Sequence, residues 1–457
     1  MNKFYITTAI DYVNAKPHIG HAFEKILADA IARYKRKHGF DVFFLTGVDE
    51  NAQKNVLAAE KVGIPVKEFI DKNALSFMEL CKKLNISYDS FIRTTDKEHA
   101  IVVQKILKKI INKGDIYKGK YEGLYCVGCE AYYTERDLIN GKCPEHNTVP
   151  ELRSEDAYFF KLSKYNKQLL KIIPKYIIPE SRKNEIISRI NEGLEDICIS
   201  RKGAKLGIDF PGDKNFKVWV WIDALINYIS GAKNNWPADV HVIGKGINWF
   251  HSVIWPAVLI SADYELPKKL LVHGYLNLEG KKISKSLGNV IDPIKLVEKY
   301  GSDSVRYSLL RCSVFEDSDF SEEILVSRHN NELADKLGNL ISRVAALIEK
   351  NGLEKCENKL LKKLREKEIE KKINSYEFDK VLNLIFEFVD VCNEYVQEKK
   401  PWETKDKKVL YELKESILKI ADFLWPFIPS TSEKITKQFS EKNIKKGEIL
   451  FRKVKVK

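Results

Sequence analysis

The order of strand-like and helix-like segments constrains the fold of this chain most strongly. Residues 4–10 (FYITTAI) form a short, β-branched, apolar run that predicts a buried strand, and residues 41–48 (DVFFLTGV) form a second one. Between them, from residue 22, apolar side chains recur at helical spacing with Lys and Arg on the opposite face. This alternation predicts βαβ units, and therefore a parallel sheet, over residues 1–115.

The alternation stops at residue 116 and resumes at residue 216. Residues 116–215 hold Gly-rich turns and clustered cysteines, which indicates an insertion, and residues 216–265 return to strands followed by helices. Residues 266–321 are turn-rich and polar, whereas residues 322–457 carry apolar residues at helical spacing. We therefore expect an α/β protein with a Rossmann-like parallel-sheet domain split by the insertion, followed by an all-α helical bundle.

A cysteine cluster lies inside the expected insertion. Its spacing is Cys126-x2-Cys129, thirteen residues, then Cys143-x2-His146. Two paired-ligand turns with thiolate and imidazole donors suit tetrahedral zinc, and four protein ligands leave no open position, so the predicted zinc is structural. The alternative is that these cysteines are merely small apolar residues.

The charge balance bears on partners and location. Lys and Arg exceed Asp and Glu by 13, which suits a polyanionic partner, although Lys-rich surfaces also occur in proteins that bind no nucleic acid. No apolar run is long enough to span a bilayer, and the N-terminus lacks the apolar core of a signal peptide. We expect a cytoplasmic protein with no membrane contact.

Three segments are candidates for phosphate binding. His18 and His21 flank Ile19 and Gly20 where a strand passes into a helix, and a helix N-terminus favours an anion. The loop KKISKSLGN (281–289) concentrates lysines that can neutralise a pyrophosphate, and VIGKGIN presents Gly244 and Gly246 after a strand. Each signal alone is weak, because chance histidine pairs and solvated lysine loops are common.

Together, HIGH (18–21) and KISKS (282–286) resemble the paired signatures of class I aminoacyl-tRNA synthetases. The chain resembles the methionyl members of that family over essentially its whole length, in TTAIDYVNAKPHIGH, FLTGVDENAQK, VWVWIDALINY, VIGKGINWFHSVIWPA and NLISR…KKPWE. The resemblance implies an enzyme that activates methionine with ATP to methionyl-adenylate and transfers it to the 3′ end of tRNA(Met), initiator and elongator. It also implies that residues 1–115 and 216–265 are the catalytic domain, residues 266–321 the KMSKS-loop segment and residues 322–457 the anticodon-binding domain.

The resemblance further assigns site residues. Asp49 would meet the ammonium group of methionine, and the residues expected around its side chain are Ala9, Ile10, Tyr12, Trp221, Leu225, Tyr228, Ile247 and His251. Apolar and aromatic walls suit a polarizable thioether, although plain core packing also explains Trp221 and Tyr228. ATP, accompanied by Mg²⁺, would be bound by His18, Gly20, His21, Gly244, Lys245 and Gly246, with Lys282 and Lys285 on its phosphates. Asn339, Arg343 and Trp402 would bind the anticodon by hydrogen bonds and stacking.

Some positions depart from the family pattern. Ile283 replaces the usual Met of the lysine loop, Leu225 stands where some members have Pro, and Leu206 stands where Trp is common. The C-terminal tRNA-binding or dimerising module of some relatives is not found, which predicts a monomer. Two alternatives stay open: a sister class I synthetase for cysteine, isoleucine, leucine or valine, and a catalytically silent tRNA-binding protein.

Overall fold

The computed structural model describes residues 2–129, 131–133, 135–278, 280–282 and 291–455. The chain divides into two compact units. Unit 1 comprises Met1–Pro17, Lys35–Cys81 and Ser87–His273, and unit 2 comprises His18–Tyr34, Lys82–Ile86 and Gly274–Lys457.

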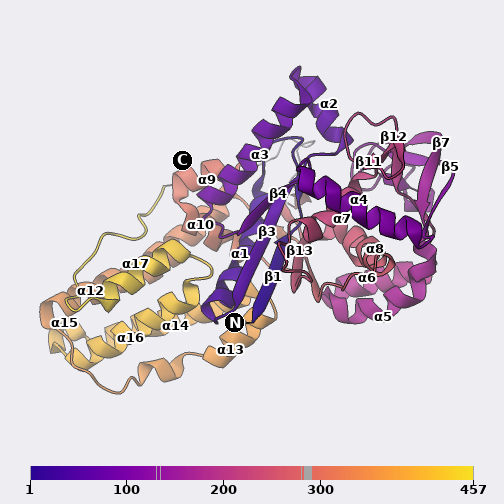
Figure 1. The fold of residues 1–457 in the computed structure, drawn as a ribbon. Helices are drawn as coiled ribbons and strands as arrows, with labels where there is room; N and C mark the ends of the chain where they lie inside the picture. The colour runs from indigo at the N-terminus through magenta and orange to yellow at the C-terminus, as the bar shows by residue number, and fades with distance from the viewer. Residues whose placement is uncertain (1, 130, 134, 279, 283–290, 456–457) are drawn as a thin grey trace. The chain divides into compact units, whose positions relative to one another are not determined.

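A parallel sheet forms the centre of unit 1 (Figure 1). Within the described residues its seven strands are β1 (Lys3–Thr8), β2 (Asp11–Tyr12), β3 (Asp41–Asp49), β4 (Ser90–Arg93), β8 (Ile177–Ile178), β13 (Val240–Gly244) and β14 (Lys269–His273). The order is β2-β3-β1-β13-β14-β8, and β4 pairs with β3. Because β1 pairs with β13 in parallel, with Ile6 opposite Val240, the second half of the chain's α/β pattern continues the same sheet as the first. The predicted fold class is confirmed.

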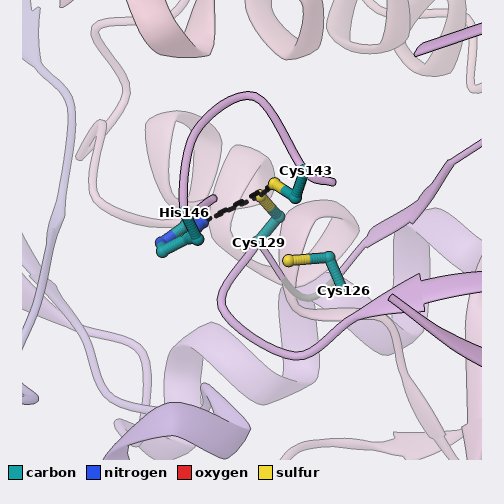
Figure 2. A group of neighbouring side chains, drawn as sticks. All are labelled: Cys126, Cys129, Cys143 and His146. Carbon is teal, nitrogen blue, oxygen red and sulfur yellow. Dashed lines mark hydrogen bonds between the residues drawn. The ribbon is translucent and has the colours of Figure 1, made fainter. Parts of the chain in front are cut away.

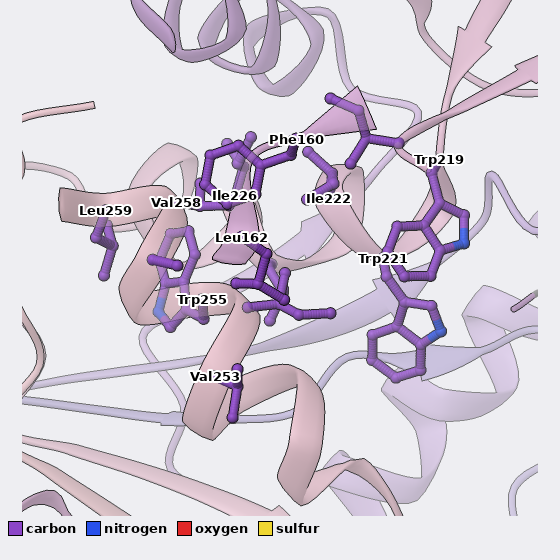
Figure 3. Packing of buried hydrophobic residues seen from close by; sticks show 14 of the residues in the cluster. Phe160, Leu162, Trp219, Trp221, Ile222, Ile226, Val253, Trp255, Val258 and Leu259 are labelled. Atoms are coloured by element: carbon purple, nitrogen blue, oxygen red, sulfur yellow. The ribbon is translucent and has the colours of Figure 1, made fainter. Parts of the chain in front are cut away.

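Helices and an apolar core complete this part of unit 1. The helices are α2 (Gln53–Val62), α3 (Val66–Lys83, whose last two residues belong to unit 2), α4 (Lys97–Asn112), α5 (Asn166–Tyr176), α6 (Glu180–Asn191), α7 (Val220–Ser230) and α8 (Trp255–Ser261). Figure 3 shows the core where α7 and α8 bring Ile222, Ile226, Trp255 and Val258 against Phe160. Trp255 is fully buried, so this core is a fixed support for the side chains that α7 presents.

The stretch 116–218 builds two smaller antiparallel sheets. One has the order β6-β5-β7-β9 and the other β10-β12-β11. Their strands are β5 (Ile116–Cys126), β6 (Ala131–Tyr133), β7 (Glu151–Phe160), β9 (Ile197–Cys198), β10 (Ser200–Lys202), β11 (Asp209–Phe210) and β12 (Asp213–Val218). The same stretch also supplies β8, which pairs in parallel with β14 of the large sheet.

Unit 2 is mainly helical, as predicted for the C-terminal region. It contains α1 (Ile19–Lys37, to Tyr34), α9 (Pro293–Tyr300), α10 (Ser302–Leu310), α11 (Glu322–Arg328), a π-helix (His329–Gly338), α12 (Asn339–Asn351), α13 (Glu366–Asn374), α14 (Phe378–Lys399), α15 (Pro401–Thr404), α16 (Lys407–Leu424) and α17 (Pro429–Ser440). A small sheet of β15 (Leu276–Leu278), β16 (Lys281–Lys282) and β17 (Ser318–Asp319) precedes the bundle. No helix in the described part of the chain has both the length and the apolar character of a membrane span.

One buried ion pair anchors α1 in unit 2. Arg306 of α10 and Asp29 of α1 are both fully buried, and their side chains are 2.7 Å apart. Arg306 also donates to the backbone carbonyls of Leu84, Pro426 and Phe427, which satisfies the guanidinium that burial removes from water. The helix that carries the HIGH sequence is therefore held by its middle.

Candidate active site and metal centre

Asp49 lies at the carboxyl end of β3, where a two-residue strand covers the edge of the sheet. Its backbone is in register with Tyr12 of β2, and Asp49 is only 2% exposed. The backbone N–H of Asn51 donates to Asp49 Oδ1 at 3.1 Å, so the turn after the strand orients the carboxylate. Ligands of parallel sheets bind at this edge, and a buried carboxylate there can pair with an ammonium group.

An aromatic group lies next to this edge. The rings of Tyr12 and Trp221 meet edge to face with centroids 6.3 Å apart. Trp221 stacks on Phe250 at 3.7 Å with the two planes 2° apart. Phe250 begins a π-helical turn (Phe250–Ile254), a distortion that often marks functional sites. Phe250 was not among the predicted site residues, although it directly precedes His251.

Tyr228 and His251 form a buried polar pair behind Trp221. His251 Nδ1 lies 3.0 Å from the carbonyl of Ile247 and therefore carries the proton, which leaves Nε2 to accept from the Tyr228 hydroxyl at 2.7 Å. Burial, with a smaller contribution from His251, lowers the pKa of nearby His241 well below its ordinary value. The His241 ring packs against the Tyr228 ring, so a neutral imidazole lies beside the pair of Tyr228 and His251.

The other predicted methionine-site residues divide into two groups. Ala9 and Leu225 are buried in the same hydrophobic cluster as Trp221 and Tyr228, and Tyr12 and Ile247 pack against it. Ile10 packs instead against a separate cluster that contains Tyr5, Leu45 and Ile92. The structure thus brings most of the predicted set together and gives Ile10 different neighbours.

A buried hydrogen-bond network that the sequence did not predict supports this site. His99 Nε2 lies 2.6 Å from Asp223 Oδ1, and Asn51 Nδ2 donates to Asp223 Oδ2 at 2.7 Å. Asn51 Nδ2 also donates to the carbonyl of Thr94 at 3.0 Å. His99 and Asp223 are shielded from solvent, so the network fixes the residue that in turn contacts Asp49. The available signal was Asp223 itself, a single carboxylate in the apolar run VWIDALINY.

The HIGH sequence lies at the N-terminus of α1 in unit 2. The two imidazole rings stack with centroids 3.7 Å apart. The backbone N–H of His18 donates to His21 Nδ1 at 3.0 Å, and that of Gly20 donates to His18 Nδ1 at 3.1 Å. Since both Nδ1 atoms accept, each neutral ring carries its proton on Nε2, where it is a hydrogen-bond donor. A Cβ at Gly20 would press against His18 Cε1 at 3.0 Å, which explains the glycine.

The remaining predicted ATP residues lie on two other segments. β13 ends at Gly244, and a short 3₁₀ helix, Lys245–Ile247, follows at the carboxyl edge of the large sheet. The backbone of Lys282 belongs to β16 and pairs with Asn277. Lys285 lies outside the described residues.

The predicted anticodon residues lie on two helices of unit 2. Asn339 and Arg343 are one turn apart on α12, and Trp402 is on α15 with 41% of its surface exposed. Both helices contact α16. The side chains of Asn339 and Arg343 make no hydrogen bond or ion pair within the described part of the chain, so their polar groups are available to a ligand.

The predicted zinc ligands gather after β5 in unit 1 (Figure 2). The ligand atoms of Cys126, Cys129, Cys143 and His146 all lie within 4.8 Å of one another. Cys129 Sγ is 3.3 Å from Cys143 Sγ and 3.2 Å from His146 Nδ1. A tetrahedral zinc with 2.3 Å bonds to sulfur requires sulfur atoms about 3.8 Å apart, so the cluster is already near that size. The residues present fit a structural zinc ion.

Local contacts prepare this cluster for a cation. A Cβ at Gly128 would lie 2.7 Å from the His146 ring, so only glycine allows the imidazole this close. Burial works to raise the pKa of Cys143, but hydrogen bonds from the backbone N–H of His146 and from the Cys129 side chain lower it overall. Burial raises the pKa of Cys129, and bound zinc would offset that cost by binding the thiolate.

Comparisons with known proteins agree with this architecture. Residues 4–148 and 145–345 match the family described as "tRNA synthetases class I (M)", and residues 358–455 match "Anticodon-binding domain of tRNA ligase". The chain therefore belongs to the class I aminoacyl-tRNA synthetases.

Individual relatives define the branch of the class. The methionine–tRNA ligases of Clostridium acetobutylicum and Thermotoga maritima are each 44% identical to it over 96% of the chain, and the alignments cover 73% and 75% of those proteins. The structure of Mycobacterium tuberculosis methionyl-tRNA synthetase in complex with methionyl-adenylate has a TM-score of 0.92 and 36% identity, covering 96% of this chain and 94% of that one. Within the class, the chain is a member of the methionyl-tRNA synthetase family.

Proposed function

We propose that this chain is a methionine–tRNA ligase, which activates methionine with ATP and transfers it to the 3′ end of tRNA(Met). The observation that carries the proposal is the aromatic site beside Asp49, in a chain of which 96% aligns with methionine–tRNA ligases. An unbranched thioether suits apolar and aromatic walls, and the buried carboxylate suits an ammonium group.

Two displacement steps account for the activity. The carboxylate of methionine attacks the α-phosphorus of ATP, and pyrophosphate leaves with the bonding electron pair. A hydroxyl of the terminal tRNA ribose then attacks the carbonyl carbon of methionyl-adenylate, and AMP leaves. Neither step needs a covalent enzyme intermediate, so the protein acts by aligning the reactants and stabilising charge on the phosphates.

The proposed roles follow from the chemistry of each side chain. His18 and His21 donate from Nε2 to the phosphates, since hydrogen bonds from the backbone occupy both Nδ1 atoms. Lys282 and Lys285 neutralise the departing pyrophosphate from the KISKS segment. Gly244, Lys245 and Gly246 bind the nucleotide at the carboxyl edge of the sheet, and Mg²⁺ enters with ATP as part of the substrate.

Asp49 binds the ammonium group of methionine, and Tyr12, Trp221 and His251 surround its side chain. The zinc ion has no part in the chemistry: the four ligands close its coordination, and it stabilises the loop whose Cys129 carbonyl accepts from Trp221 Nε1 at 3.3 Å.

Amino-acid-dependent ATP–pyrophosphate exchange, without tRNA, tests the activation step. We expect exchange with methionine and none with cysteine, isoleucine, leucine or valine, and loss of exchange in Lys285→Ala. Exchange with another of these amino acids would agree with a class I synthetase but would contradict methionine as its substrate. No exchange with any of them, in folded and zinc-loaded protein, would favour the silent tRNA-binding alternative.

The anticodon role of unit 2 has its own test. Trp402 is exposed and can stack on an unpaired base, a contact worth about 1–3 kcal/mol. Trp402→Ala should therefore raise the KM for tRNA(Met) about tenfold and leave ATP–pyrophosphate exchange unchanged, with Trp425→Phe as the control. Equal aminoacylation by Trp402→Ala and the unsubstituted chain would contradict the assignment.

Three further proposals concern the state of the protein. We propose that it is a cytoplasmic monomer that charges both initiator and elongator tRNA(Met). Light scattering of the purified protein tests the monomer, fractionation of source cells tests the location, and parallel aminoacylation of the two tRNAs tests whether both are substrates.

A further inference from the structure

Lys54 lies between the proposed methionine site and the metal cluster and has no part in the proposed function. It is partly buried in the first turn of α2. Its Nζ lies over the Tyr12 ring, 3.1 Å from the ring centroid, and donates to the backbone carbonyl of Gly128 at 3.4 Å. Lys54, Tyr12 and Gly128 all belong to unit 1, so these contacts lie within one compact unit.

Buried hydrogen bonds fix the start of α2 against the end of β3. Asn55, which is fully buried, donates from Nδ2 to the backbone carbonyls of Asp49 at 3.2 Å and Glu50 at 3.0 Å. The main chain of Lys54 is therefore held next to the strand that carries Asp49. The flexible part of Lys54 is its side chain, and the Gly128 carbonyl restrains the ammonium group at the far end.

Contacts with the ring decide how Tyr12 is oriented. Tyr12 lies in β2, a strand of two residues, and its pairing with Asp49 places the backbone but leaves the side-chain torsions of Tyr12 free. Lys54 lies over a face of the ring, and Trp221 meets the ring edge to face. The negative potential of an aromatic face attracts an ammonium group. Lys54 and Trp221 therefore restrain the Tyr12 ring together.

The turn that follows β5 takes part in both of these contacts. The Gly128 carbonyl accepts from Lys54, and the carbonyl of the next residue, Cys129, accepts from Trp221 Nε1 at 3.3 Å. Successive carbonyls of one turn thus bind the two side chains that contact the Tyr12 ring. A ring that is restrained before methionine arrives lowers the ordering cost of binding.

We propose that Lys54 is a positioning residue of the methionine site. It holds Tyr12 in the orientation that packs on the methionine side chain, and it acts through that ring rather than on the substrate. This inference rests on the proposed function and adds a residue that the proposed function does not use. Because such a restraint acts on binding alone, loss of the Lys54 ammonium should weaken methionine binding and leave kcat and the KM for ATP unchanged.

A double-mutant cycle of Lys54→Met and Tyr12→Leu tests the proposal. Calorimetry without ATP measures the Kd for methionine, and ATP–pyrophosphate exchange measures KM and kcat. We expect Lys54→Met to raise the Kd and the KM for methionine about fivefold, as the loss of a partly buried cation–π contact implies. In the Tyr12→Leu background the same change should leave both constants unaltered, because the ring through which Lys54 acts is absent.

Two further variants show which feature of Lys54 matters. Lys54→Arg keeps a cation that can lie over the ring, so it should recover most of the affinity for methionine. Lys61→Met removes the charge of an exposed lysine on the same helix and is the matched control, with no expected change in Kd. Equal losses in Lys54→Met and Lys61→Met would mean that general charge is responsible and would overturn the proposal, as would an Arg variant no better than Lys54→Met.

Three other results would also overturn it. An unchanged Kd in Lys54→Met would mean that Tyr12 needs no such restraint. The same loss with and without the Tyr12 ring would mean that Lys54 acts directly on bound methionine. A lower kcat or a higher KM for ATP would assign Lys54 to the chemical step. All three arise in a protein that binds methionine, whereas an unsubstituted chain that binds none would overturn the proposed function and this inference with it.

Discussion

The metal cluster and the proposed methionine site lie in the same unit, and a hydrogen bond from Trp221 Nε1 to the Cys129 carbonyl joins them. They are built in different ways. The cluster takes all four ligands from residues 126–146, whereas the methionine site joins residues from β2, β3, α7 and the π-helical turn. The geometry of a local cluster depends on its bound ion. The geometry of a site assembled from distant segments depends instead on packing and on buried hydrogen bonds.

Removal of the metal should have the largest effect on local stability, and that effect should be confined to the segment that holds the cluster. A structural zinc contributes about 10–16 kcal/mol of binding free energy to the segment that holds it. Zinc chelation or Cys129→Ser should therefore abolish amide hydrogen-exchange protection over residues 126–146 and leave β1, β3 and β13 protected. Cys356→Ser, which changes a cysteine outside the cluster, is the control. If protection at β1 and β3 falls as well, the two regions are not independent.

Substitution of the methionine-site carboxylate should affect activity rather than folding. Asp49→Asn keeps the shape and removes the charge that we assign to the ammonium group, and the loss of a buried charge partner costs about 2–5 kcal/mol. We expect kcat/KM for methionine in ATP–pyrophosphate exchange to fall about a thousandfold, with the urea midpoint little changed. The exposed Asp263→Asn is the control. An Asp49→Asn enzyme with ordinary methionine kinetics would move the ammonium site elsewhere.

Loss of the buried network should affect both stability and methionine binding. His99→Leu leaves Asp223 buried without its imidazole partner, at a cost of about 3 kcal/mol. The urea midpoint should fall, and the KM for methionine should rise because the Asp223 carboxylate, which accepts a hydrogen bond from Asn51, loses the imidazole that holds it in place. His99→Gln, which retains a hydrogen-bond donor, should recover part of the urea midpoint and part of the affinity for methionine. An unchanged urea midpoint in His99→Leu would show that the pair of His99 and Asp223 makes no net contribution to the free energy of unfolding.

The hydrogen bond between the two regions is expected to contribute little. Trp221→Phe keeps an aromatic ring for Phe250 and removes the donor to the Cys129 carbonyl, a change of about 1 kcal/mol. Zinc release measured by competition with a chromogenic chelator should speed up only a few-fold. A change larger than a hundredfold would mean that the metal cluster and the methionine site act as one unit.

The contrast between a site made of neighbouring residues and a site assembled from distant segments also explains which features could be predicted from the sequence. The grouping of Cys126, Cys129, Cys143 and His146 and the proximity of His18 and His21 could be predicted because each set is contained in short spacings, at turns and at a helix N-terminus. The stack of Phe250 on Trp221 and the link from His99 to Asp223 were not found, since they depend on which segments the sheet brings together. β8 was missed for another reason: two residues carry no periodicity, and pairing with β14 alone defines the strand.

The smallest expected effect concerns Asp115, at the junction between α4 and the segment that carries the metal cluster. Burial alone would raise the pKa of Asp115, but hydrogen bonds from Lys164, Tyr165 and Ser261 hold it below its ordinary value. A depressed carboxyl pKa stabilises the fold at pH values above its unfolded pKa, near 4, and that contribution is lost as the pH falls through the lower folded pKa.

The free energy of unfolding should therefore decline below pH 4 in the unsubstituted chain and decline less steeply in Asp115→Asn, as urea titrations at a series of pH values would measure. Asp263→Asn, at an exposed position, should keep the slope of the unsubstituted chain. Identical slopes in all three proteins would show that this junction does not couple protonation to folding, and the metal-bearing segment would then owe its attachment to β8 and the apolar core.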